Sequence, residues 1–362
     1  MLKPDNGLNL VRLAMVVLVI LSHSYTIGRH GGSPLYLGNT SGQWALAGLF
    51  SVSGFLVSSG RLRRGLALYL WHRVLRLWPA FMLCLLVIVL LFAPVAYILE
   101  RGSISGFFGA QSGPGPFLLS NSLFEIRQYT VSGTPNTDPA GWIGNLWTVF
   151  FTVVCYVAIG VVLGIRRERV RLLVLVSVFV LTVVAHANID AVMTYAQDGR
   201  VAPVLRFLPF FLGGTIIYEL RRRLRLSVLF ALPAAGATAL LALLFPAWAL
   251  QMASPLIAYC LLVLGNILPA PRVLRANDLA MGAFMYSYAV QMLLRVFGVP
   301  ALVDGVWAFF ALSVLATVPF AIGSWLLAER PVIRRLRSGE GRPERNVDGT
   351  ARPIKRVPQA LL

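Results

Sequence analysis

Charge is scarce in this sequence: Asp, Glu, Lys and Arg make up only 13% of its 362 residues, whereas 57% are hydrophobic. An ordinary soluble domain carries about 25% charged residues. The charge is also one-sided, with 32 Lys and Arg against 14 Asp and Glu. Because the basic residues fall in short clusters between apolar runs rather than on one soluble face, the sequence favours a multi-pass membrane protein and argues against nucleic acid as a partner.

Cysteine and the common cofactor motifs are also scarce or absent. Cys84, Cys155 and Cys260 each lie singly in an apolar run, so we expect small core residues rather than a disulfide framework or a zinc site. The sequence holds no G-x-x-x-x-G-K-[ST] loop, no G-x-G-x-x-G turn, no H-E-x-x-H motif and no acidic cluster. We therefore expect no metal site and no permanently bound cofactor. Few carboxylates lie within the apolar runs, which argues against a proton- or cation-coupled pump.

What the sequence does hold is a series of apolar runs of about 20 residues, each long enough to cross a bilayer. The first run is interrupted by Arg12 and lacks a following A-x-A site, so we expect a retained span rather than a cleaved signal peptide. The fold class predicted is an all-α, polytopic membrane helix bundle. Its ten expected spans are residues 8–27, 43–59, 75–98, 143–164, 171–188, 203–219, 226–247, 250–268, 279–298 and 305–327.

Arginine clusters alternate with loops that hold only scattered basic residues. The clusters lie at 61–73, 166–171, 221–225 and 272–275, and in the tail from residue 330. By the positive-inside rule, this alternation places both termini in the cytoplasm. We expect residues 1–330 to form the transmembrane domain, and residues 331–362 to form a basic, disordered cytoplasmic tail in contact with anionic membrane lipids. The Arg-rich, Lys-poor composition suggests a GC-rich bacterial genome, and we expect the protein in the bacterial cytoplasmic membrane.

The long loop from about 99 to 142 is expected on the outer side. It is rich in Gly, Ser, Pro and Asn, as in "GAQSGPGPFLLSNS" and "SGTPNTDPAGW". Such a loop can cover a site from outside, or it can be a solvated connector. The sequence leaves both interpretations open.

Two ionisable residues lie at the ends of the stretch "RLAMVVLVILSH". Arg12 and His23 are eleven positions apart, close to three helical turns, so they share one face about 16 Å apart along the axis. Such groups usually face the bundle interior or a watery cavity, and we expect this face to line a cavity that reaches toward both sides. His23 is then a candidate general base. The alternative is that Arg12 extends to the interface and His23 forms a hydrogen bond at the outer boundary.

A second basic pair begins the third span, in "YLWHRVLRLWPAF". Arg73 and Arg76 are three positions apart and share a face at the cytoplasmic helix end. Guanidinium groups suit phosphates, so a nucleotide-containing donor from the cytoplasm is one candidate ligand. Anchoring by the positive-inside rule is the other interpretation.

Five segments resemble the motifs of acyltransferase family 3, a family of integral membrane acyltransferases. The segments are "NGLNLVRLAMVVLVILSHSY", "LFSVSGFLVSSGRLRR", "YLWHRVLRLWPAF", "GNLWTVFFTVVCYV" and "AERPVIRRL". Each pattern alone is a weak indication of this family, but five patterns in the family's order on ten expected spans form a specific signal. The resemblance implies ten transmembrane helices and transfer of an acyl group, often acetyl, from cytoplasmic acyl-CoA as co-substrate. The implied acceptor is a hydroxyl of a glycan, a lipid-linked glycan or a secondary metabolite.

The resemblance also assigns roles to residues of this chain. His23 matches the essential histidine of the family and Arg12 its paired arginine, while Arg73 and Arg76 match the arginine pair that holds the donor's phosphates. Transfer can be direct or can pass through an acyl-histidine. The residues expected to line the pocket are Asn9, Ser53, Trp147, Thr148, Thr152 and Tyr156.

Three positions depart from the family pattern. Asn9 stands where the family has a carboxylate, and Thr152 stands where it has a glutamate. The segment "FMYSYAVQMLL" lacks a His or Gly often found there. These losses keep a second hypothesis open, a non-catalytic relative that transports or flips a glycan or lipid.

Overall fold

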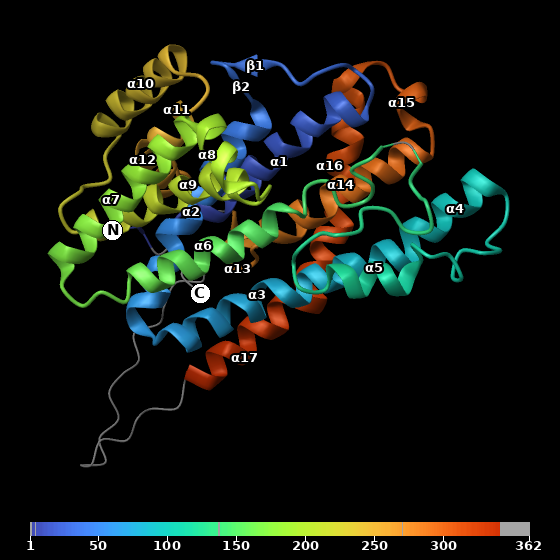
Figure 1. Ribbon diagram of the computed structural model, residues 1–362, viewed down its shortest axis with the longest axis horizontal. Coiled ribbons are helices and arrows are strands. Elements are labelled where there is room, and N and C mark those ends of the chain that lie inside the picture. The colour runs from blue at the N-terminus through green and yellow to red at the C-terminus, as the bar shows by residue number, and fades with distance from the viewer. Residues whose placement is uncertain (1, 4, 137, 270, 341–362) are drawn as a thin grey trace.

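The computed structural model describes residues 2–3, 5–136, 138–269 and 271–340. It is a bundle made almost entirely of helices, with one two-residue strand pair (Figure 1). The strands are β1 (Leu35–Tyr36) and β2 (Asn39–Thr40). The helices are α1 (Leu8–Ile27), α2 (Ser41–Arg63), α3 (Leu66–Val87), η1 (Ile88–Phe92), α4 (Ala93–Arg101), α5 (Pro114–Asn121), α6 (Thr148–Val162), α7 (Glu168–Ala187), α8 (Ile189–Ala196), α9 (Val201–Leu220), α10 (Val228–Leu244), α11 (Ala249–Met252), α12 (Ser254–Ile267), α13 (Arg272–Ala276), α14 (Ala280–Val296), α15 (Val299–Leu302), α16 (Gly305–Ser324), η2 (Trp325–Glu329) and α17 (Arg330–Glu340).

Each of the ten expected spans overlaps at least one of these helices. Six helical segments are long and apolar enough to cross a membrane: Leu8–Ile27, Ser41–Arg63, Leu66–Arg101, Glu168–Ala187, Val201–Leu220 and Gly305–Leu336. Three shorter apolar helices accompany them, α6, α10 and α12. A membrane helix bundle is therefore confirmed, whereas ten crossings and cytoplasmic termini stay predictions.

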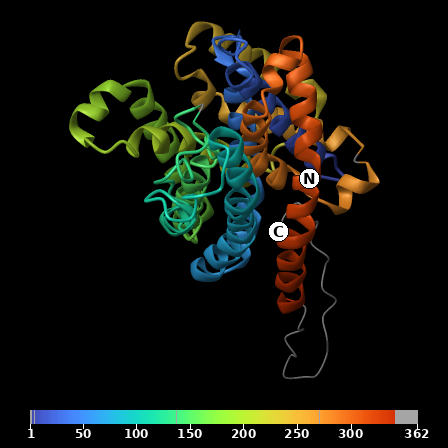
Figure 2. The ribbon, with the colours of Figure 1, turned by 90° about the vertical axis from the view of Figure 1, so that its right-hand side faces the viewer.

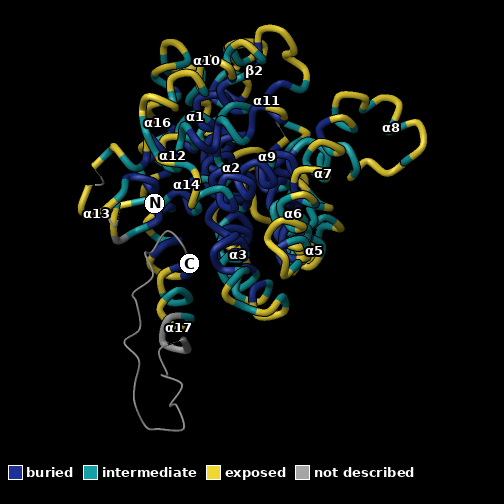
Figure 3. The backbone as a smooth tube through the Cα atoms, turned by 90° about the vertical axis from the view of Figure 1, so that its left-hand side faces the viewer, coloured by how far each residue is buried: buried dark blue, intermediate teal, exposed yellow. Residues whose placement is uncertain are grey.

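Helices α2 and α9 form the centre of the bundle, and most of their residues are buried (Figure 3). The two helices come so close that a Cβ added at Gly54 would overlap the carbonyl of Phe211, and one at Gly214 would overlap that of Ser51. Only glycine permits this approach, as expected of small residues at membrane helix contacts.

Helix α2 begins with a capping box, in which Thr40 accepts a hydrogen bond from the Gln43 amide and Gln43 accepts one from the Thr40 amide. Such a cap contributes about 1 kcal/mol to the stability of the helix.

The start of the tail expected to be disordered is helical instead. Helix α17 continues α16 and η2 beyond the bundle on the side of α3 (Figures 1 and 2). The physical reason is that Val332, Ile333 and Leu336 fall on one helix face, with arginines on the other, so the segment is amphipathic. The prediction was therefore wrong for residues 331–340, and residues 341–362 lie outside the described residues.

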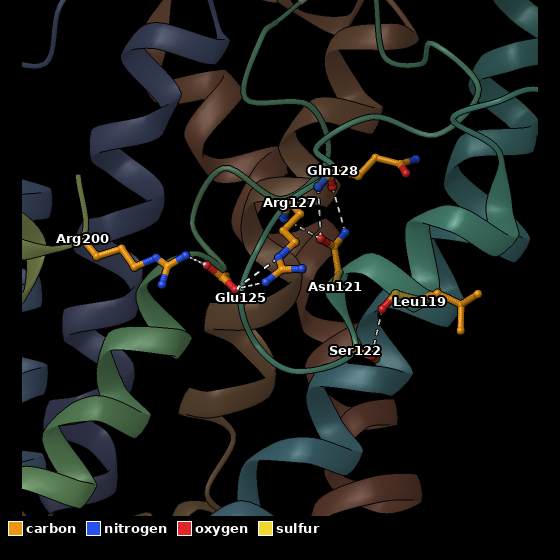
Figure 4. Close-up of polar contacts among 7 residues, drawn as sticks. All are labelled: Leu119, Asn121, Ser122, Glu125, Arg127, Gln128 and Arg200. Atoms are coloured by element: carbon orange, nitrogen blue, oxygen red, sulfur yellow. Dashed lines mark hydrogen bonds and ion pairs between the residues drawn. The ribbon is translucent and has the colours of Figure 1, made fainter. Parts of the chain in front are cut away.

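The loop between α4 and α6, which is expected on the outer side, packs against the bundle. Its residues Phe107, Phe117, Val131 and Trp142 are fully buried. The loop carries the short helix α5, whose last residue, Asn121, accepts hydrogen bonds from the backbone amides of Arg127 and Gln128 (Figure 4).

Two ion pairs connect this loop to other helices. Glu125 binds Arg127 within the loop and Arg200 just before α9 (Figure 4). Asp138 binds Arg295 of α14 at 3.4 Å. The loop therefore packs against the helices, and its role as a cover over a site stays a prediction.

Candidate active site

Three adjoining cavities lie within the helix bundle. We call them the inner cavity, lined by Arg12, the middle cavity, lined by His23, and the outer cavity, lined by His186, with volumes of about 100, 180 and 230 Å³. Leu46 lines all three. Thr148 and Phe284 line both the inner and the middle cavity, so the cavities follow one another as a series.

At the inner end, the carboxylate of Asp278 bridges two guanidinium groups. Asp278 accepts a hydrogen bond from Arg12 of α1 and a second, of 2.9 Å, from Arg76 of α3. All three side chains are nearly buried, with 9–13% of their surface exposed. Burial raises the pKa of the Asp278 carboxyl, but the charges of Arg12 and Arg76 lower it by more, so its pKa lies below the usual value.

The side chains of Arg73 and Arg76, which the sequence predicts as a pair, have different partners. The Arg73 side chain turns toward the ring of Tyr69, with 5.7 Å from Cζ to the ring centroid. Arg73 is only 4% exposed, and its Nε and Nη2 have no hydrogen-bond partner among the described residues. Arg73 is therefore a buried cation with donors free for an anionic ligand, whereas Arg76 is paired with Asp278.

A second buried carboxyl group, Glu329 of η2, lies at the same end. Ser324 donates a hydrogen bond of 3.0 Å to Glu329 Oε1, and Glu329 interacts electrostatically with Asp278, Arg76 and Arg12. The sequence analysis missed both Asp278 and Glu329 as site residues. Each carried a signal in the sequence: Asp278 directly precedes an apolar span in a chain poor in acidic residues, and Glu329 lies in the segment "AERPVIRRL" that resembles a family motif.

In the middle cavity, the imidazole of His23 contacts α14. The ring of Tyr288 meets it edge to face at 5.1 Å between centroids. Gln291 of α14 donates hydrogen bonds to the Ile20 carbonyl and to Ser24 Oγ, which fixes α14 against this part of α1. His23 Nδ1 is buried and has no hydrogen-bond partner in the described part of the chain. This nitrogen is therefore available to a bound molecule.

Most of the other expected pocket residues line one of these two cavities. Ser53, Thr152 and Tyr156 line the inner cavity, Thr148 lines both, and Trp147 lines the middle one. The hydroxyl groups of Ser53, Thr148 and Thr152 donate to carbonyls of Leu49, Asn145 and Thr148, respectively. Because their protons are used in this way, these hydroxyls offer acceptor lone pairs to a ligand.

Asn9 lies apart from the cavities. Its side-chain amide donates a hydrogen bond of 2.9 Å to the Leu274 carbonyl and holds the α13 segment against α1.

Within the described residues, no group of three or more His, Cys, Asp or Glu side chains could hold a metal ion. The site thus offers guanidinium groups at its inner end and an unpartnered imidazole nitrogen at His23.

Comparison with known families gives one match over nearly the whole chain. Residues 5–329 match the model of the third acyltransferase family, which is described as "Acyltransferase domain". No solved structure matches the chain.

Two curated proteins are similar at low identity. An "O-acetyl transferase" of Shigella phage Sf6 is 26% identical over 220 residues, which span 59% of this chain and 63% of the phage protein. "Nodulation protein 10" of Rhizobium leguminosarum bv. viciae is 25% identical over 371 residues, which span 91% of this chain and 93% of that protein. The match to the phage protein thus leaves more than a third of its length uncovered.

Proposed function

This chain belongs to acyltransferase family 3, and on that premise we propose that it transfers an acyl group from cytoplasmic acyl-CoA to a hydroxyl group of a glycan, a glycolipid or a similar acceptor. Acetyl is the proposed acyl group, because the similar phage protein carries the name O-acetyl transferase. We propose the bacterial cytoplasmic membrane as its location.

One observation supports this proposal above the others. His23 lies in the middle cavity with a free ring nitrogen, and that cavity adjoins the inner cavity, which is lined by Arg12. A site for the donor's phosphates on one side of a base, with room for an acceptor on the other, is the arrangement that acyl transfer requires.

The proposed reaction needs one proton acceptor and one leaving thiol. The imidazole of His23 takes the proton of the acceptor hydroxyl while the hydroxyl oxygen attacks the thioester carbonyl carbon. The carbonyl electrons move to the oxygen and return as the C–S bond breaks. The CoA thiolate leaves and takes the proton from the His23 imidazolium, so the products are an ester and a free thiol. General-base assistance of this kind contributes roughly 10²–10⁴-fold in rate.

Arg73 is the residue best suited to hold the donor. It is buried, and its free N–H groups match phosphate oxygens. Arg12 and Arg76, paired with Asp278, supply a fixed charged group beside the inner cavity. The thioester must then pass Leu46, Thr148 and Phe284, which line the boundary between the inner and middle cavities.

The departures at Asn9 and Thr152 fit this proposal in a specific way. The carboxylate that neutralises Arg12 comes from Asp278 rather than from position 9 of the same helix. Thr152 keeps a place in the wall of the inner cavity and offers a hydroxyl oxygen there. We propose that Asp278 fulfils the charge-balancing role that the family assigns to carboxylates missing here.

The test is incubation of the purified full chain with labelled acetyl-CoA and a membrane extract. The proposal predicts labelled ester on an acceptor, sensitive to mild base, and free CoA in equal amount. The alternative, a carrier, predicts no labelled acceptor together with movement of a glycolipid across vesicles that contain the protein. The second pattern would contradict the proposal.

A further inference from the structure

The guanidinium group of Arg206 lies where the middle and outer cavities meet. Arg206 is in the first turns of α9 and lines both cavities. Its Cζ lies 5.8 Å from the centroid of the Phe207 ring. No carboxylate in the described ranges pairs with Arg206, and no Asp or Glu lines either cavity.

Three arginines of the neighbouring segments do have carboxylate partners. Arg127 and Arg200 bind Glu125, and Arg295 binds Asp138. Arg206 lines two cavities and has no carboxylate partner among the described residues, so its guanidinium group can pair with an anionic group of a molecule bound there. Arg206 thus has the character of a binding group.

The remaining polar lining suits hydroxyl groups. Asn39, Gln43 and Gln251 supply side-chain amides to the outer cavity. His186 lines the same cavity, and its Nδ1 is buried with no partner in the part of the chain that the structure describes. Amides and a neutral imidazole donate and accept hydrogen bonds, as the recognition of a sugar requires.

We propose that the middle and outer cavities bind an acceptor that carries one negative group, a carboxylate or a phosphate. That group pairs with Arg206, while a hydroxyl of the same molecule lies at His23. The inference rests on the proposed acyl transfer and names the class of its acceptor. Arginine is the side chain best shaped to bind either group through two parallel hydrogen bonds. Since Arg206 and His23 line the same middle cavity, one small molecule can reach both.

Binding without donor tests the inference. The probes share one ring: methyl glucoside, methyl glucuronoside and glucose 6-phosphate, compared at equal ionic strength with the purified full chain. We expect at least one acidic probe to raise the unfolding temperature and to bind at least about tenfold more tightly than the neutral glycoside, a difference of about 1.4 kcal/mol. The two acidic probes distinguish a carboxylate from a phosphate.

Two variants of Arg206 and one control variant test whether this residue causes the preference for the acidic probes. Arg206→Gln should bind all three probes equally, and Arg206→Lys should retain part of the preference because it keeps the charge but not the fork. Arg200→Gln, which removes an exposed arginine from the same end of α9, should behave like the wild type. The inference is wrong if neither acidic probe binds the wild type better than the neutral one, or if Arg206→Gln keeps the preference.

The transfer assay separates this inference from the proposed function. Acidic probes that bind through Arg206 while no acceptor receives label would contradict acyl transfer but not the binding site. Labelling of a neutral acceptor that is unchanged in Arg206→Gln would contradict the inference but not acyl transfer.

Discussion

Asp278 forms an ion pair with Arg12, although the two residues are separated by 266 positions in the chain. The pair joins the first helix of the bundle to the start of α14, and Arg76 adds α3 to the same carboxylate. The charge of the site is thus fixed by three segments that only the tertiary fold brings together.

Replacing Asp278 should destabilise the protein strongly. Asp278→Asn leaves Arg12 and Arg76 buried without the carboxylate that bridges them, and removal of one partner of a buried pair costs about 3–5 kcal/mol. We expect a lower unfolding temperature in detergent and at least a tenfold loss of transfer activity. Glu125→Gln is the control, because the arginines it binds are 59% and 66% exposed and such pairs contribute about 0–1 kcal/mol. Equal effects of the two substitutions would contradict the assigned importance of Asp278.

The contribution of Asp278 should also depend on pH in a defined direction. Its pKa is lowered in the folded state, so the unfolded chain binds the proton more readily than the folded protein does. The stabilisation is therefore present above the unfolded value of about 3.9 and is lost as the pH falls through the lower folded value. The stability difference between wild type and Asp278→Asn should stay constant at neutral and mildly acidic pH and shrink below about pH 4. A difference that already shrinks near neutral pH would contradict this assignment.

Removing Arg73 should weaken the binding of acyl-CoA rather than slow the chemical step. Arg73→Gln should raise KM for acetyl-CoA about tenfold or more with little change in kcat, since charge-assisted hydrogen bonds contribute about 1.5–3 kcal/mol. Acetyl-pantetheine lacks the phosphates, so its kinetics should not change. Arg63→Gln, an exposed arginine on the same side, serves as the control. A loss of activity that is equal with both donors would assign Arg73 a structural role instead.

Leu46 should control passage between the cavities, because it lines all three. Leu46→Trp fills the shared boundary and should lower kcat/KM at least tenfold, as expected when the reacting groups cannot meet. Leu243→Trp makes the same change on an exposed face of α10 and should leave activity near the wild-type value. If both variants retain full activity, the cavities are not the route of the substrates.

Part of this site was predictable from local periodicity. The spacing of Arg12 and His23 places both on one face of α1, and each does line a cavity. The same rule placed Arg73 and Arg76 on one face of α3, but their side chains contact different partners. Residues three apart diverge by about 60° around the helix axis, which is enough here for one to meet Asp278 and the other Tyr69.

The rest depends on contacts between distant segments, which no local pattern encodes. Glu329 reaches the site through the π-helical turn η2, and the outer loop closes through pairs such as Asp138 with Arg295. Arg206 did carry a signal, since an arginine within an apolar run is by default a functional candidate. It was missed because the positive-inside rule directs attention to the loops rather than to the spans.

The measurement that tests the central claim most directly is acetyl transfer by His23→Ala in purified, folded protein. The account predicts a fall in kcat of roughly 10²–10⁴-fold, with an unchanged unfolding temperature and unchanged KM for acetyl-CoA. Tyr288→Phe, which keeps the ring beside His23, and His30→Gln should both retain most of the activity. Transfer by His23→Ala at nearly the wild-type rate would contradict the assignment of His23 as the base.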